Sequence, residues 1–140
     1  MDVAAPPSGA LRTKSGLAYK ILHAGHGRNR PKLKDTVEVA FTGWTSQGEM
    51  FNTTVGRPRP AELPMAQLIP GWREALVAMV AGEQRRLWVP ENLAMQGRAG
   101  LPPGMLVFDL ELLEIENEAE EERERAHEAV KDANTRSVTP

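Results

Sequence analysis

The chain has 140 residues, 41% of them hydrophobic, and a formal net charge of −2 from 17 basic and 19 acidic residues. This length suits one domain with its own core, and the near balance of charge argues against nucleic acid as a partner, because phosphate binding needs a concentrated basic face. The sequence has no cysteine, which excludes disulfides and thiolate metal sites.

The first fifteen residues are rich in Ala, Pro, Ser and Gly, and they predict a flexible N-terminal segment over 1–15. They lack the apolar run of a secretory signal. No window of the sequence reaches the roughly 18 apolar residues of a membrane span. We therefore expect a soluble, cytoplasmic protein with no membrane partner.

Apolar residues alternate in residues 17–22 and, more regularly, in residues 36–44, and both stretches predict strands. In the second stretch, Val37, Val39 and Phe41 share one face. A basic loop that contains glycines and a proline separates the two strands. A short turn then leads to a brief third strand or loop.

Residues 67–79 read QLIPGWREALVAM and predict a helix that begins at a proline. Pro70 suits the first helical turn, where its missing N–H costs nothing, and Gly71 permits a close approach of the backbone. Apolar residues then recur at helical spacing on one face: Trp72, Ala75, Leu76, Met79 and Val80. Gly82 is a plausible stop for this helix.

Trp72 is the first residue of the apolar helical face, and the pattern leaves two interpretations open. It is either an ordinary core residue or the floor of a pocket, because it lies where the helix meets the preceding Leu68 and Ile69.

Two further strands are predicted after the helix, over residues 84–90 and 104–116, with an irregular loop between them. Leu87 and Val89 share one face of the first of these strands. Four or five strands with one helix indicate the α+β class, in which an amphipathic helix covers one face of an antiparallel sheet.

Residues 117–140 form a charged C-terminal tail whose Glu, Arg and Ala content favours helix. Its few apolar residues favour a solvated helix over a docked one. A helix that binds a partner or a second copy of the chain is the alternative.

Motifs for polar catalysis or metal binding are missing from the sequence. His23, His26 and His127 do not have the spacing of metal ligands. No Gly-x-Ser-x-Gly elbow is present, and the lone Gly25-x-Gly27 pair does not make a dinucleotide loop. We therefore expect neither a metal nor a cofactor.

Six blocks of the sequence, in this order and spacing, are those of a known family: VAFTGW (39–44), GEMFNTT (48–54), QLIPGWREALVAM (67–79), GEQRRLWVPENLA (82–94), LPPG (101–104) and LVFDLELLEI (106–115). Over residues 16–116 the chain resembles the FKBP family of peptidyl-prolyl cis-trans isomerases. The resemblance implies a twisted antiparallel sheet of about five strands wrapped around one short helix.

The resemblance also implies a function, which is to accelerate rotation of Xaa-Pro peptide bonds in folding or unfolded proteins. The proline would lie in an apolar pocket with Trp72 as its floor. The pocket residues carried over from the family are Phe41, Phe51, Asn52, Leu68, Ile69, Trp72, Met95, Leu101 and Phe108. Within this set, the catalytic group is Phe41, Phe51, Asn52, Trp72, Met95 and Phe108.

The implied partners are proline-containing segments of client proteins, with the macrolide ligands of the family as a further candidate class. A monomer is favoured. Phe41, Asn52 and Met95 stand where the family usually has Tyr, Asp and Tyr, so polar groups at the pocket rim are altered. We expect an isomerase of reduced efficiency. The alternative is a non-catalytic, chaperone-like module that binds the same segments.

Overall fold

The computed structural model of the chain describes residues 2–94 and 100–116. Two predictions, the helical tail over 117–140 and the candidate site residue Met95, lie outside the described residues.

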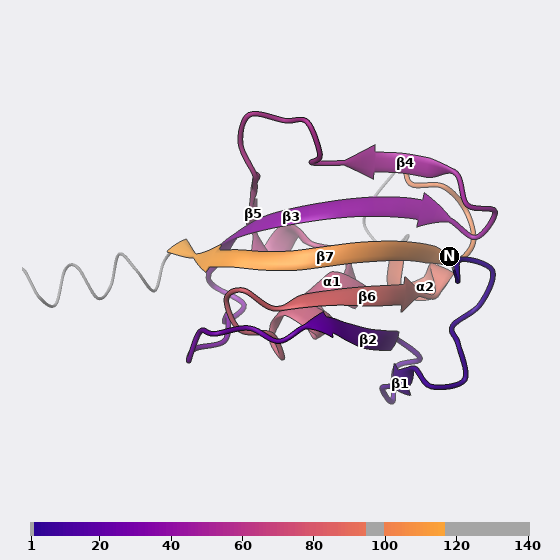
Figure 1. The fold of residues 1–140 in the computed structure, drawn as a ribbon, viewed down its shortest axis with the longest axis horizontal. Helices are drawn as coiled ribbons and strands as arrows, with labels where there is room; N and C mark the ends of the chain where they lie inside the picture. The colour runs from indigo at the N-terminus through magenta and orange to yellow at the C-terminus, as the bar shows by residue number, and fades with distance from the viewer. Residues whose placement is uncertain (1, 95–99, 117–140) are drawn as a thin grey trace, which may run out of the picture.

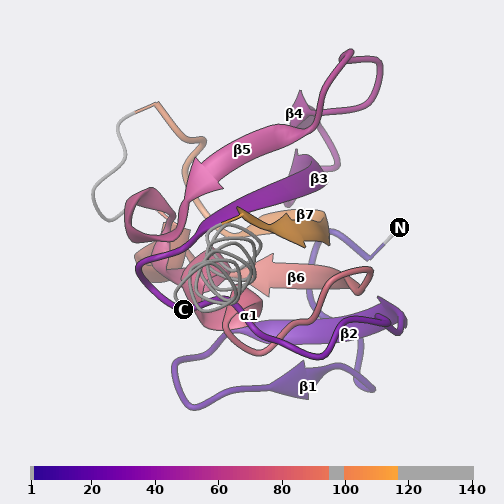
Figure 2. The same ribbon diagram turned by 90° about the vertical axis from the view of Figure 1, so that its left-hand side faces the viewer.

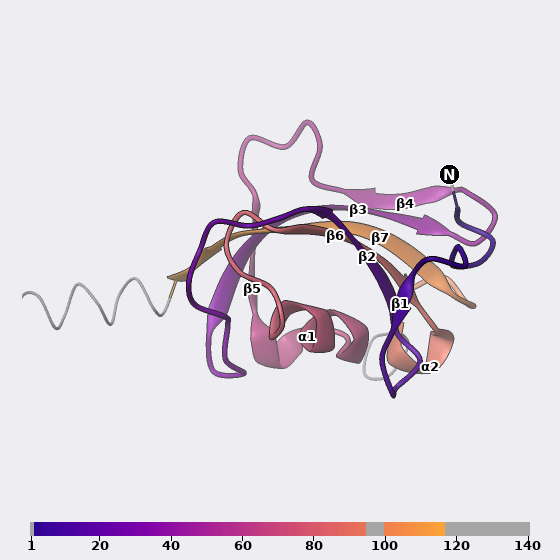
Figure 3. The ribbon, with the colours of Figure 1, turned by 60° about the horizontal axis from the view of Figure 1, so that its bottom comes forward.

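The described residues form one antiparallel sheet that arches over a short helix (Figures 1 and 3). The strands run along the sheet in the order β1-β2-β6-β7-β3-β4, and β5 pairs with β3 off this path. Figure 2 shows β1 and β4 at opposite edges. The strands are β1 (Leu11–Arg12), β2 (Ala18–His23), β3 (Thr36–Thr45), β4 (Met50–Thr53), β5 (Ala61–Pro64), β6 (Gln84–Val89) and β7 (Leu106–Ile115).

Three short helical elements accompany the sheet: the 3-10 turn η1 (Met65–Gln67), α1 (Pro70–Leu76) and α2 (Glu91–Ala94). The predicted architecture, a twisted antiparallel sheet wrapped around one short helix, is confirmed. The sheet has seven strands where about five were expected. The additional ones are the short β1 and β5, which lie in segments whose prolines and small residues predict loops.

Strands β3 and β7 are the longest strands of the sheet, with ten residues each, and successive side chains along them point to opposite faces of the sheet. The predicted inward face of β3 is confirmed, because Val37 and Val39 are buried in the main core. Opposite them, Ile115 and Leu112 of β7 join the same core. Burial of each such side chain stabilises the fold by about 1.5–3 kcal/mol, so the concave face of the sheet holds most of the hydrophobic core.

Helix α1 ends at Leu76, four residues before the Val80 that the apolar pattern includes. The backbone N–H groups of Ala78 and Met79 bond carbonyls three residues back instead of four, which tightens the chain. The Ala78 carbonyl accepts a hydrogen bond from Arg85 Nη2 at 3.2 Å. Met79 still reaches the core and is fully buried. The apolar period therefore predicted the buried face correctly but not the helix end.

The convex face of the sheet carries a second, smaller apolar cluster around Trp88 and Val107. Val3 and Ala10 of the N-terminal segment pack against it, and Trp88 Nε1 donates a hydrogen bond to the Asp2 carbonyl. The sequence predicts a flexible segment over 1–15, whereas here residues 2–15 make specific contacts. The physical reason is that Trp88 of β6 points away from the main core, and packing of the N-terminal segment removes this apolar side chain from water.

Three glutamates lie side by side on neighbouring strands of the sheet. Glu38 of β3 is directly opposite Glu62 of β5 on one side and Glu114 of β7 on the other. Partial burial, followed by repulsion from Glu114 and Glu62, raises the pKa of Glu38 above its usual value. Like charges directly opposite one another destabilise a sheet, so this ladder costs stability whenever it is ionised.

We predict that Glu38→Gln raises the thermal unfolding temperature at pH 7 by roughly 2 °C, since exposed charges interact weakly. A pKa raised in the folded state means that folding favours the protonated form. The penalty is therefore present above the raised pKa and is lost as the pH falls towards 4. Melting curves of wild type and variant should converge there. Glu49→Gln, in the loop before β4, is the control with the same change of charge; an equal gain in that control would contradict the ladder.

Candidate functional site

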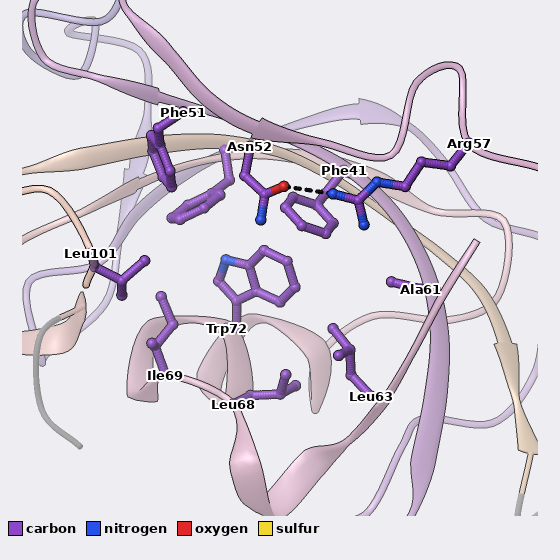
Figure 4. Close-up of a pocket in the computed structure, with 11 residues that line it drawn as sticks. Phe41, Phe51, Asn52, Arg57, Ala61, Leu63, Leu68, Ile69, Trp72 and Leu101 are labelled. Atoms are coloured by element: carbon purple, nitrogen blue, oxygen red, sulfur yellow. Dashed lines mark hydrogen bonds between the residues drawn. The ribbon is translucent and has the colours of Figure 1, made fainter. Parts of the chain in front are cut away.

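A cavity of about 200 Å³ lies between the sheet and the N-terminal end of α1 (Figure 4). Its walls come from β3, β4, β5, β7, the start of α1 with the two residues before it, and two loops that contribute Arg57 and Leu101. Eleven residues line it: Phe41, Phe51, Asn52, Arg57, Ala61, Leu63, Leu68, Ile69, Trp72, Leu101 and Phe108.

Trp72 occupies the floor of the cavity because of how α1 begins. Pro70 is in the first helical turn, as the sequence predicts. Gly71 lies against the sheet, and a Cβ atom there would be only 2.6 Å from Val89 Cγ1. The missing side chain therefore lets the helix start close to β6. This approach leaves Trp72 only 5% exposed.

Four aromatic rings form the apolar wall. Trp72 packs edge to face with Phe41 at 4.8 Å between ring centroids and with Phe108 at 5.2 Å, and Phe51 packs in the same manner on Phe108 at 5.7 Å. Gly43 of β3 permits this arrangement, because a Cβ atom there would lie 2.8 Å from Phe51 and 2.9 Å from Phe108. T-shaped packing is favourable for aromatic quadrupoles, so the rings make a stiff surface.

The polar part of the lining is confined to one side and is held by a tight turn. The Arg57 backbone N–H donates to the Thr54 carbonyl at 3.0 Å, and Gly56 between them has a φ of 84°, as a type II turn requires. Thr54 Oγ1 accepts a hydrogen bond from the Phe41 backbone N–H at 2.9 Å, which fixes the turn to β3. Arg57 Nη2 then donates to Asn52 Oδ1 at 2.8 Å (Figure 4).

Two hydrogen-bond donors of the pocket lining are available to a ligand. Asn52 Oδ1 also accepts from the Thr53 backbone N–H at 2.9 Å, so the Asn52 acceptor is already engaged. Its amide nitrogen points into the cavity in Figure 4. Trp72 Nε1 is buried and has no hydrogen-bond partner within residues 2–94 and 100–116. A buried donor without a partner is costly, and both donors suit a ligand carbonyl.

The structure brings together eight of the nine pocket residues that the resemblance implies, and it leaves Met95 outside the described residues. A residue can line the pocket and also belong to the buried core, as Trp72 and Phe108 do. The two interpretations of Trp72 are therefore both correct: it is a core residue and the floor of a cavity. The catalytic roles of these residues stay predictions.

Three lining residues are missing from the sequence-based set: Arg57, Ala61 and Leu63. Prolines at 58, 60 and 64 predict a loop there, although an edge strand tolerates proline. The alternation of Ala61 and Leu63 around a glutamate is the signal that would have revealed β5. No sequence pattern marks Arg57, whose position depends on the turn before it.

Within the described part of the chain, no three His, Asp or Glu side chains gather as a possible metal site. No helix there has the length and apolar character needed to span a membrane.

An antiparallel sheet thus arches over one short helix and encloses a mostly apolar, aromatic pocket floored by the first-turn tryptophan. The family model of the FKBP-type peptidyl-prolyl cis-trans isomerases matches residues 27–113, which is more than half of the chain. The chain belongs to this family.

Relatives with curated names agree with this assignment. The FKBP-type 22 kDa peptidyl-prolyl cis-trans isomerase of Escherichia coli is 41% identical over 115 residues, covering 79% of this chain and 55% of its own. FkpA of Aeromonas hydrophila is 39% identical, covering 82% of this chain and 44% of its own. The outer membrane protein MIP of Legionella longbeachae is 39% identical, covering 79% and 49%. The chain thus spans about half the length of the curated relatives it matches.

Solved structures share the fold. The crystal structure of FkpA from Escherichia coli superimposes with a TM-score of 0.70 at 36% identity, covering 78% of this chain and 52% of that one. A peptidyl-prolyl cis-trans isomerase from Pseudomonas syringae gives a TM-score of 0.67 at 28% identity, covering 78% and 82%.

We predict that Trp72→Ala lowers both stability and proline-peptide affinity, whereas Trp72→Phe keeps most of the fold. Truncating a buried tryptophan to alanine typically costs about 3–5 kcal/mol of unfolding free energy. Denaturant unfolding measures the first effect, and chemical-shift titration with a Leu-Pro peptide measures the second. Trp44→Phe, on the convex face, is the control and should leave peptide affinity unaltered.

A double variant, Trp44→Phe with Trp88→Phe, leaves Trp72 as the only tryptophan of the chain. Its fluorescence should change when the peptide binds. An unchanged spectrum, together with unaltered affinity in Trp72→Phe, would show that the bound peptide does not contact Trp72.

Proposed function

We propose that this domain catalyses the cis-trans isomerisation of Xaa-Pro peptide bonds. Membership of the family supports the reaction, and the aromatic cavity with its buried Trp72 floor is the observation that carries it. A proline ring is apolar, compact and rigid, which suits a cavity whose walls are edge-to-face aromatic rings.

Such a reaction needs no nucleophile, since no bond is made or broken. Amide resonance opposes rotation of a peptide bond by about 18–20 kcal/mol, and uncatalysed Xaa-Pro isomerisation takes roughly tens to hundreds of seconds. Twisting the bond localises the nitrogen lone pair and reduces charge separation. A low-polarity surrounding therefore disfavours the planar amide more than the twisted one.

The polar side of the pocket would position the substrate backbone. Asn52 offers an amide N–H₂ group towards the cavity (Figure 4), and Trp72 offers a buried indole N–H. Either can donate to a carbonyl next to the proline. A neutral donor holds a carbonyl less strongly than a charged one, so these two donors would contribute modestly to the rate.

We predict that the protein at micromolar concentration accelerates cis-trans exchange of a Leu-Pro or Phe-Pro peptide in an NMR exchange experiment. Trp72→Ala should reduce kcat/KM at least tenfold, which corresponds to about 1.4 kcal/mol of lost transition-state stabilisation. Leu33→Ala, an exposed position that does not line the pocket, is the control and should keep the wild-type rate. Absence of acceleration by the wild type would overturn the isomerase assignment.

Substitutions at the rim of the pocket can distinguish an isomerase from a non-catalytic binding module. Asn52→Asp combined with Met95→Tyr should raise kcat/KM for a neutral peptide, because a hydrogen bond that involves a charged group contributes about 1.5–3 kcal/mol. Peptide affinity is measured in parallel by titration. A gain in rate with unchanged affinity would mean that this pocket has shifted from catalysis towards binding. An unchanged rate would contradict a role for these two positions in catalysis.

The clients that we propose are proline-containing segments of folding or unfolded proteins, so the domain would act as a folding helper. The macrolide ligands implied by the family resemblance stay a candidate class, and a monomer stays the favoured state. The cytoplasmic location is likewise a proposal drawn from the sequence; one relative carries the name outer membrane protein MIP.

A further inference from the structure

The rim of the pocket offers donors and one positive charge, with no carboxylate. Of the eleven lining residues, Arg57 is the only charged one. It makes no ion pair within the described ranges; its guanidinium bonds the Asn52 amide oxygen. An amide neutralises none of the arginine charge, so the charge remains available to a ligand.

The Asn52–Arg57 bond also determines which atoms of the rim face a ligand. Asn52 Oδ1 is occupied by Arg57 Nη2 and by the Thr53 N–H, which leaves the Asn52 amide nitrogen as the free end. In Figure 4 this nitrogen points into the cavity, while the Asn52 oxygen faces the guanidinium. A guanidinium has five N–H donors, of which Asn52 uses one. The two side chains therefore present adjacent donors and no free acceptor.

Resting on the proposed isomerase function, we propose that Arg57 and Asn52 form a carboxylate-recognition element that selects Xaa-Pro segments carrying an acidic group next to the proline. Carboxylate oxygens accept from a guanidinium and an amide N–H₂ in one plane, and such charge-assisted bonds are stronger than neutral ones. Arg57 is thus a specificity-determining residue.

The position of Arg57 is built into the fold, which distinguishes it from an ordinary surface arginine. The type II turn over residues 54–57 fixes its backbone, and Thr54, only 8% exposed, anchors that turn to β3. Arg59, two residues along, is also exposed but does not line the pocket. The two arginines have the same charge and differ in position, so Arg59 is a matched control.

The size of the effect follows from exposure. Arg57 and Asn52 are both exposed, and an ion pair in solvent is weak and screened by salt. We expect a preference of about two- to fivefold in kcat/KM at low ionic strength, falling towards one in high salt.

The experiment compares matched peptides by NMR exchange. One arm uses a Glu-Pro peptide and its Gln-Pro analogue, so that only the side-chain charge differs. The other arm uses a peptide that ends in Leu-Pro, with either a free carboxylate or an amide at its C-terminus. The result expected is a higher kcat/KM for the carboxylate member of at least one arm, and the arm identifies the source of the carboxylate. Equal values in both arms would overturn the proposal.

Four variants test the assignment to these side chains. Arg57→Gln should bring the carboxylate-to-amide ratio to one, and Arg57→Lys should keep part of it. Asn52→Asp places a counter-charge on the guanidinium and should abolish the preference. Arg59→Gln should leave the ratio and the basal activity unchanged. A ratio that survives Arg57→Gln, or that falls equally in Arg59→Gln, would contradict the assignment.

Failure of this proposal can be told apart from failure of the isomerase function. The same peptides are titrated against the wild-type protein and Arg57→Gln, with chemical shifts as the readout. If no peptide is accelerated but the ratio of dissociation constants still favours the carboxylate and depends on Arg57, the isomerase function fails and the recognition element stands. If neutral peptides are accelerated without such a preference, the recognition element alone fails.

Discussion

The Trp72 indole packs edge to face against Phe41 and Phe108, and these contacts join the first turn of α1 to β3 and β7, the two longest strands of the sheet. The helix has only seven residues, too few to be stable alone, so its position depends on this packing. The cavity lies at the same place, between the sheet and the start of α1. Stability and ligand binding therefore share one side chain, and selection for either constrains both.

The division of the pocket into an apolar wall and a polar rim suits a reaction that only rotates a bond. The wall supplies a low dielectric in which the planar amide loses its advantage. The rim, formed by Asn52 and Arg57, supplies direction and charge without an acid, a base or a nucleophile. In this chain the rim is positive and rich in donors, and in our proposal Asn52 thereby helps to decide which kind of segment the pocket accepts.

The two faces of the sheet separate different tasks. The concave face carries the core and the pocket, while the convex face carries Trp88 beneath the N-terminal segment. The glutamate ladder lies at the end of β3 that pairs with β5. The turn that positions Arg57 is hydrogen-bonded further along the same strand, at the Phe41 backbone. The ten-residue strand β3 thus carries the central glutamate of a destabilising ladder and also anchors the turn that positions the rim residue Arg57.

The sequence by itself determined the inward faces of the strands, the start of the helix and, through its resemblance to a family, eight of the pocket residues. These depend on local period and on motifs of fixed spacing. Tertiary structure alone decided the rest. This comprises the early end of the helix, after which Arg30 and Arg85 bond the Ala78 carbonyl, the packing of the N-terminal segment on Trp88, and the position of Arg57. Each of these depends on a contact between residues whose pairing leaves no periodic trace in the sequence, because a hydrogen bond across the fold requires proximity and not pattern.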